Sequence, residues 1–226
     1  MIAFYPLQLV TRGLPEKTPW VNWILVVLNV AFYYFSWMAG WDWSCGRGSS
    51  VLSVVLYGFS HAGFWHLAFN MWTLLVFGDA VNRRIGNKYY LLAYLSSILL
   101  IGFFCWLIFP GRVIGASGAI FTVIGISLLL LPAARLRVGM LAIFPVTLVV
   151  AIFNRPKEFY QWAIRWGDFF VPMLWCLLLV PLLEFFGLLW SGWSWTNLGH
   201  LMGLVLGVVF VLLLPHSVTM RRPAVA

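Results

Sequence analysis

The sequence predicts an all-α membrane protein, a polytopic bundle of six transmembrane helices. Of its 226 residues, 63% are hydrophobic and only 9% are charged, and the mean hydropathy is +0.96. Such a chain has too little polar surface to cover a soluble domain. Several separate apolar runs have about the 20 residues that a membrane-spanning helix needs. The distribution of Lys and Arg then decides how many of these runs cross.

Three regions are predicted along the chain. Residues 1–19 form a cytoplasmic N-terminal segment that is too polar for a signal peptide, residues 20–215 form the membrane domain, and residues 216–226 form a basic tail. Within the membrane domain the candidate spans are the apolar runs at 20–39, 62–79, 89–109, 117–132, 138–153, 169–190 and 197–215.

Basic residues are enriched in the cytoplasmic loops of membrane proteins. If 138–153 does not cross and the N-terminus is inside, 12 of the 14 Lys and Arg residues lie inside, and only Arg47 and Arg112 lie outside. If 138–153 also crosses, the split becomes 7 to 7. The charges therefore favour six spans with both termini cytoplasmic. The net charge of +8 is interpreted as a signal of topology and not of nucleic-acid binding.

The segment between the fourth and fifth spans is predicted to stay on the cytoplasmic side. Residues 138–153 are short for a span and contain Pro145, so a re-entrant or interfacial element is expected there. Residues 154–168 are typical of an amphipathic stretch on the anionic inner leaflet. The region 138–168 is thus expected to lie in or on the membrane without crossing it.

The fourth span opens with the tetrapeptide Gly115-Ala116-Ser117-Gly118 and ends near Leu131. About 15 helical residues span roughly 23 Å, against about 30 Å of hydrocarbon. A helix anchored at the inner surface therefore begins below the outer surface, and the loop before it must dip into the membrane. Such backbone is tolerated where it lines a water-filled cavity. Ser117 is expected at the bottom of an outward-facing cavity, among free N–H groups.

Three further polar side chains are expected at the same depth. His66 and Asn70 are spaced i, i+4 on one face of the second span, and His200 lies three residues inside the last span. With six spans, the helices of Ser117 and His200 both run from outside to inside, so the two residues can meet near the outer ends. A serine becomes a nucleophile when a base accepts its proton, and histidine suits this role near neutral pH.

Each feature also has a structural alternative. A lone serine in a membrane helix usually hydrogen-bonds to its own helix, and Gly203 and Gly207, which follow His200, can serve close helix packing. Several intramembrane ionisable groups together indicate function. Glu184 in the fifth span has no obvious basic partner, so a structural role is expected. Because no carboxylate is evidently placed to orient His200, a Ser-His dyad is predicted in place of a triad.

The order of these polar and small residues resembles the rhomboid family of intramembrane serine proteases, over about residues 20–215. The motifs that carry the resemblance are His61-x4-His66-x3-Asn70, Gly115-Ala116-Ser117-Gly118 and His200-x2-Gly203-x3-Gly207. The resemblance implies a six-helix core and hydrolysis of peptide bonds inside the membrane. The supporting positions that it implies are His61, Gly115, Gly118, Phe121, Gly203 and Gly207.

The resemblance also implies catalytic roles. Ser117 would be the nucleophile, and His200 would act first as general base and then as general acid. His66 and Asn70, with the backbone N–H of Ser117, would form the oxyanion hole. His61 would support this region from the loop.

The chain departs from the family pattern at three places. The Trp-Arg pair of the first outer loop has no counterpart in GWDWSCGRGSS. Gly78-x3-Asn82-x3-Gly86 stands where many members have glutamate at the central position. Phe121 could stack on His200 but lacks the hydroxyl that a tyrosine would offer.

No cofactor or metal is expected. The three cysteines are widely separated, which predicts neither a disulfide framework nor a zinc site, and a His-Glu-x-x-His motif is absent. The expected partners are single-span membrane protein substrates and the lipid bilayer, with no nucleic acid; the sequence leaves the oligomeric state open. The expected location is a bacterial inner membrane, with the active site opening outward.

Two alternative functions remain from the sequence. The first is a non-catalytic rhomboid-like protein that binds transmembrane segments and escorts or retains them. The second is a small transporter, which would need matched broken helices in two halves that this chain lacks.

Overall fold

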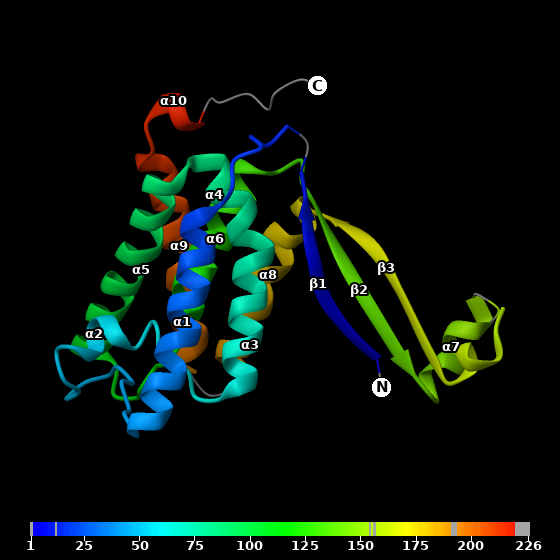
Figure 1. The fold of residues 1–226 in the computed structure, drawn as a ribbon, viewed down its shortest axis with the longest axis horizontal. Helices are drawn as coiled ribbons and strands as arrows, with labels where there is room; N and C mark the ends of the chain where they lie inside the picture. Colours follow the sequence, from blue (N-terminus) through cyan, green and yellow to red (C-terminus); the bar gives the residue numbers. More distant parts are fainter. Residues whose placement is uncertain (1, 12, 154, 156, 191–193, 220–226) are drawn as a thin grey trace.

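The computed structural model describes residues 2–11, 13–153, 155, 157–190 and 194–219. Most of these residues are helical, and Figure 1 shows a bundle of helices with a three-stranded sheet beside it. Within these residues, four helices are long and apolar enough to cross a membrane, namely α1 (Trp20–Ala39), α5 (Asn87–Ile108), α8 (Met173–Trp190) and α9 (Trp195–Leu213). The predicted helical membrane bundle is therefore confirmed, whereas the sheet was not predicted.

Each of the six predicted spans contains helical structure. The second span is one continuous helical segment with a π-helical turn, and it reaches further than the predicted 62–79. In chain order the segments are α1 (Trp20–Ala39), α3 (Phe64–Thr73) with η1 (Leu74–Gly78) and α4 (Asp79–Ile85), α5 (Asn87–Ile108), α6 (Ser117–Leu130), α8 (Met173–Trp190) and α9 (Trp195–Leu213). Two short helices accompany them, α2 (Ser53–Leu56) and α10 (His216–Thr219).

Helix α6 lies in the middle of the bundle, and most of its side chains are buried. Its 14 residues span about 21 Å, less than the hydrocarbon thickness. It packs mainly against α9, where a Cβ at Gly207 would lie 2.6 Å from the carbonyl oxygen of Thr122. The hydroxyl of Thr122 in turn donates to the carbonyl of Gly203 at 3.0 Å. The two backbones thus approach as closely as glycine permits.

Gly203→Ala is expected to destabilise the bundle, because a Cβ at Gly203 would lie 2.2 Å from the carbonyl oxygen of Gly118, and backbone atoms cannot yield as a flexible side chain can. Overpacking of this kind costs about 1–3 kcal/mol. Thermal unfolding in detergent measures the loss. Gly199→Ala on the same helix is the matched control, since nothing lies within 4 Å of a Cβ there. An unchanged unfolding temperature in Gly203→Ala would contradict the close packing.

The sheet joins the N-terminal segment to the region between α6 and α8. Its antiparallel strands are β1 (Ile2–Val10), β2 (Arg135–Ile143) and β3 (Ile164–Pro172), with β2 in the centre. The guanidinium of Arg137 on β2 forms an ion pair with the carboxylate of Asp168 on β3. Residues 1–19, predicted only as a cytoplasmic segment, therefore contribute a strand.

The secondary structure of 138–168 differs from the predicted amphipathic stretch. The chain forms most of β2, α7 (Val146–Phe153), the 3-10 turn η2 (Phe159–Trp162) and then β3, and the expected place of this region in or on the membrane stays a prediction. Residues 169–172, predicted to open the fifth span, complete β3. The reason is backbone pairing: the hydrogen bonds of β2 are satisfied by strands on both sides, so this stretch needs no helix. Figure 1 shows α7 at the end of the sheet away from the bundle.

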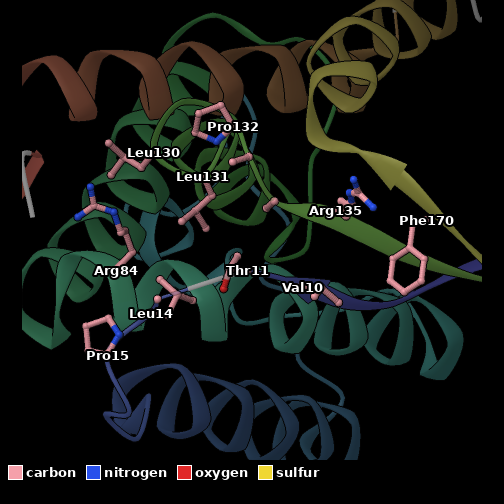
Figure 2. Close-up of a pocket in the computed structure, with 13 residues that line it drawn as sticks. Val10, Thr11, Leu14, Pro15, Arg84, Leu130, Leu131, Pro132, Arg135 and Phe170 are labelled. Atoms are coloured by element: carbon pink, nitrogen blue, oxygen red, sulfur yellow. The ribbon is translucent and has the colours of Figure 1, made fainter. Parts of the chain in front are cut away.

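A cavity of about 740 Å³ lies where β1 and β2 meet the bundle (Figure 2). Leu130 and Leu131, at the C-terminal end of α6, line it together with Thr11, Arg84 and Arg135. It therefore lies at the opposite end of α6 from the predicted nucleophile. Among the described residues that line this cavity there is no predicted site residue.

Candidate active site

Ser117 is the first residue of α6, where a loop turns into the helix. The loop is held by neighbours: the N–H of Gly115 donates to the carbonyl of Tyr57 at 2.9 Å, and Val113 pairs with Cys45 in an isolated bridge. In the part of the chain that the structure describes, no side chain caps α6. The first N–H groups of a helix have no intrahelical partner, so the positive helix end at Ser117 stays available to a negative group.

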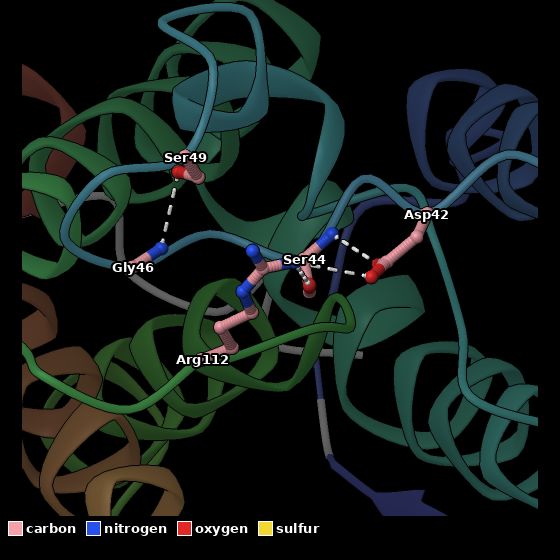
Figure 3. A network of polar contacts seen from close by, with 5 residues as sticks. All are labelled: Asp42, Ser44, Gly46, Ser49 and Arg112. Atoms are coloured by element: carbon pink, nitrogen blue, oxygen red, sulfur yellow. Dashed lines mark hydrogen bonds and ion pairs between the residues drawn. The ribbon is translucent and has the colours of Figure 1, made fainter.

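The same loop is fastened to the loop after α1 (Figure 3). Arg112 Nη1 lies 3.3 Å from Asp42 Oδ2 and 3.3 Å from Ser44 Oγ. Hydrogen bonds from Ser44, aided by the guanidinium of Arg112, lower the pKa of the Asp42 carboxyl. The ion pair itself is largely exposed and contributes little stability. The loops also touch through their backbones, since a Cβ at Gly46 would lie 2.2 Å from the carbonyl oxygen of Gly111.

Gly115 brings α3 to the start of α6. Its φ is 116°, in the region that favours glycine. A Cβ at this position would lie 2.7 Å from His66 Cε1 and 3.4 Å from Asn70 Nδ2. Both side chains of α3 therefore lie against the loop that leads into Ser117, and a larger residue at 115 would push them away.

Two N–H donors face this loop. The backbone N–H of Ala62 donates to His66 Nδ1 at 3.4 Å, so the proton of the neutral imidazole lies on Nε2. That nitrogen would be 2.8 Å from a Cβ at Gly115. Asn70 Nδ2 is buried and has no hydrogen-bond partner within the described residues. A buried unpaired donor is costly, and this one lies where a reaction intermediate could use it.

His61 packs edge-on against His66, with ring centroids 5.2 Å apart. It is buried, and its ring nitrogens have no hydrogen-bond partner among the described residues. Burial, together with the nearby His66, lowers the pKa of His61 to about 4. The ring is therefore neutral near pH 7 and contacts the α3 histidine from the loop side.

His200 lies in the second turn of α9, and its ring stacks on Phe121 with centroids 4.1 Å apart and planes 5° apart. Phe121 follows Ser117 by four residues on α6, so the two share one face of that helix. Close contact between Gly203 and the carbonyl of Gly118 holds α9 against this face. The imidazole thus lies on the Ser117 side of α6. Its Nε2 is buried and unpaired within the described part of the chain.

Glu184, predicted to be structural and without a basic partner, lies beside His200. Its Oε2 is 2.9 Å from His200 Nδ1 and accepts a hydrogen bond from Asn197 Nδ2 at 2.7 Å. A carboxylate therefore lies within hydrogen-bonding distance of the His200 ring, although none was evidently placed there in the sequence. Glu184 lies six residues before the end of α8 at Trp190, and His200 lies five residues after the start of α9 at Trp195, so the two reach similar depths on neighbouring helices. This hairpin spacing could have indicated the contact from the sequence.

The arrangement combines the groups that acyl transfer requires. A hydroxyl lies at a helix N-terminus, an imidazole with a free nitrogen lies on the same helix face, and two N–H donors line the neighbouring loop. Such a set can supply a nucleophile, a base and a site for a developing oxyanion.

Comparison with known proteins gives a family match over most of the chain. The model of the Rhomboid domain matches residues 48–217, which contain every predicted site residue. Helix α1 and β1 lie before this range.

Individual relatives match shorter stretches. "Rhomboid protein 1, mitochondrial" of Saccharomyces cerevisiae is 32% identical over 131 residues, which cover 54% of this chain and 37% of the yeast protein. "Presenilin-associated rhomboid-like protein, mitochondrial" of Mus musculus is 31% identical over 99 residues, or 42% of this chain and 26% of the mouse protein. The Bacillus subtilis protein YdcA, whose name includes the words "rhomboid protease", is 39% identical over 70 residues, covering 30% of this chain and 35% of that protein.

Proposed function

This chain belongs to the rhomboid family, and we propose that it is a serine endopeptidase that hydrolyses peptide bonds in or near transmembrane segments. The observation that carries the proposal is the His200 ring, which stacks on Phe121 one turn after Ser117 and keeps a buried, unpaired Nε2 within the described residues. An unpaired imidazole nitrogen on the same helix face as a serine can accept the proton of that hydroxyl.

In the proposed reaction, Ser117 Oγ attacks the scissile carbonyl carbon while His200 Nε2 accepts the hydroxyl proton. The carbonyl oxygen becomes an oxyanion that accepts hydrogen bonds from His66 Nε2, Asn70 Nδ2 and the Ser117 N–H. His200 then gives its proton to the leaving amine, and the C–N bond breaks. A water molecule attacks the acyl-enzyme, His200 takes its proton and returns it to Ser117 Oγ, and the free carboxyl product leaves.

The proposed substrates are single-span membrane proteins cut near the outer end of the span. A helix hides its carbonyls in hydrogen bonds, so the substrate must unwind locally, and Gly or Pro near the scissile bond should help. The start of α6 is crowded by Gly115 and Gly118 and by the closely packed α9. This crowding supports a preference for a small residue before the scissile bond.

The proposed location is a bacterial inner membrane, with both termini cytoplasmic and the active site opening outward. The predicted split of basic residues supports this orientation. In the six-span topology that this split favours, α6 and α9 both run from outside to inside. Ser117 and His200 then both lie near the outer ends of their helices.

Purified protein in liposomes is expected to cleave a single-span substrate without metal or ATP, and a chelator should have no effect. A substrate with Ala before the scissile bond should be cut at least tenfold faster than one with Phe, because a lost fit of this kind is worth about 1–3 kcal/mol. Cleavage products resolved by mass spectrometry give the site and the rate, and a fluorophosphonate probe should label the protein. Binding of the substrate without cleavage or labelling would instead support the non-catalytic alternative, and equal rates for Ala and Phe would refute the small pocket.

A further inference from the structure

A carboxylate lies behind the proposed base. Glu184 on α8 and His200 on α9 are largely buried, with side-chain exposures of 16% each. Oε2 of Glu184 is 2.9 Å from Nδ1 of His200, a hydrogen-bonding distance. An ionisable side chain at this depth is costly unless a partner compensates it.

The contact determines which nitrogen of His200 can act as a base. When Nδ1–H donates to the carboxylate, the lone pair of the neutral ring lies on Nε2. That nitrogen is the one left unpaired among the described residues. Glu184 therefore selects the tautomer that a serine nucleophile needs.

Two further contacts hold the pair in place. Asn197 Nδ2, on the same helix as His200, donates to Oε2 of Glu184 at 2.7 Å, which fixes the carboxylate. Phe121 stacks on the face of the His200 ring and so restrains tilting of the ring. The hydrogen bond at Nδ1 restrains rotation within the ring plane. The ring is thus held on its face by one helix and on its edge by another.

We infer that Glu184 is a positioning residue that completes a Ser117–His200–Glu184 triad. The inference rests on the proposed function, and Glu184 acts through His200 without touching the substrate. It holds the imidazole in the productive tautomer, and its negative charge stabilises the imidazolium formed when Ser117 loses its proton. Among the described residues, His66 on α3 also interacts electrostatically with His200, and it is neutral in the hydrogen-bonded form described above.

A purely structural role has a different signature. If Glu184 only ties α8 to α9, an uncharged residue with the same shape and an acceptor oxygen should replace it without loss of activity. Glutamine is that residue, because its Oε1 can accept from both His200 and Asn197. Leucine removes the acceptor as well as the charge.

In liposomes, Glu184→Gln is expected to unfold at the wild-type temperature but to lose about 10- to 100-fold in kcat with KM unchanged, as expected when a charge close to the base is removed. Fluorophosphonate labelling of Ser117 should slow by the same factor. Glu184→Leu should lose more activity and also unfold at a lower temperature. Glu158→Gln, at the exposed carboxylate that precedes η2, is the matched control and should keep wild-type kcat.

The outcomes separate the two claims. Wild-type kcat in Glu184→Gln, with an active wild-type protein, would overturn the triad and leave the protease intact. An unlabelled, inactive wild-type protein would overturn the protease and the triad with it. If Glu184→Gln does not fold, Asn197→Ala decides: a several-fold lower kcat at unchanged KM supports the positioning role, and an unchanged kcat contradicts it.

Discussion

Ser117→Ala and His200→Ala are each expected to abolish proteolysis, with kcat reduced by roughly 10⁴-fold or more, and to leave the fold intact. Loss of the hydroxyl removes the nucleophile, and loss of the imidazole removes the group that accepts its proton. Residues that act as a unit are non-additive, so the double variant should lose no more than either single variant. Rates of substrate cleavage in liposomes and of fluorophosphonate labelling measure both effects.

Matched controls are available for both substitutions. Ser127→Ala removes a buried hydroxyl from the same helix, where Oγ donates to the carbonyl of Ile124 at 2.7 Å, and should keep near-wild-type kcat. His216→Ala removes an exposed histidine from α10 and should change nothing. Cleavage that persists in Ser117→Ala, with correct products, would eliminate Ser117 as the nucleophile.

Asn70→Ala is expected to lower kcat by about 10²–10³ with little change in KM, because removal of one oxyanion donor typically costs this much. The hydrogen bond from Asn70 to the oxyanion forms mainly in the transition state, so the loss should appear in kcat. His66→Ala should behave comparably. The double variant should lose less than the product of the two losses, since both donors serve one oxyanion. Ser117 should still react with a fluorophosphonate in either single variant, though more slowly.

A buried asparagine elsewhere separates catalysis from stability. Asn29 on α1 donates to the carbonyl of Leu25 and to the hydroxyl of Tyr94. Asn29→Ala should therefore lower the unfolding temperature and leave the kcat of folded protein unchanged. If Asn70→Ala follows that pattern, Asn70 is a packing residue, and the oxyanion must rest on His66 and the Ser117 N–H.

The helical part of the structure could be predicted because its causes are local. Apolar runs of sufficient length mark the spans, and the small residues at Gly203 and Gly207 mark the face on which α6 and α9 meet. The start of α6 at Ser117 follows from the shortness of that run. These features depend only on neighbouring residues and on the thickness of a bilayer.

The sheet could not be predicted from the same information. Strand β1 and strand β2 are paired across more than a hundred residues, as in Ile2 with Ala142. In an apolar chain, alternation of polar and apolar residues is a weak signal, and Pro6 stands inside β1 at an irregularity of the register. The contact of Glu184 with His200 is hard to predict for another reason, since it joins two different helices and the pattern of either helix alone does not indicate it.

The central place of β2 in the sheet also has a consequence for biosynthesis. Strand β1 precedes α1 in the chain, yet its partner β2 is synthesised only after α1 to α6 have been made. The pairing of β2 with β3 closes within a much shorter stretch of chain. Closing a long loop carries the larger entropic cost. Strand β1 therefore cannot pair with β2 until the helices between them have been made, whereas β3 can pair with β2 soon after it is synthesised.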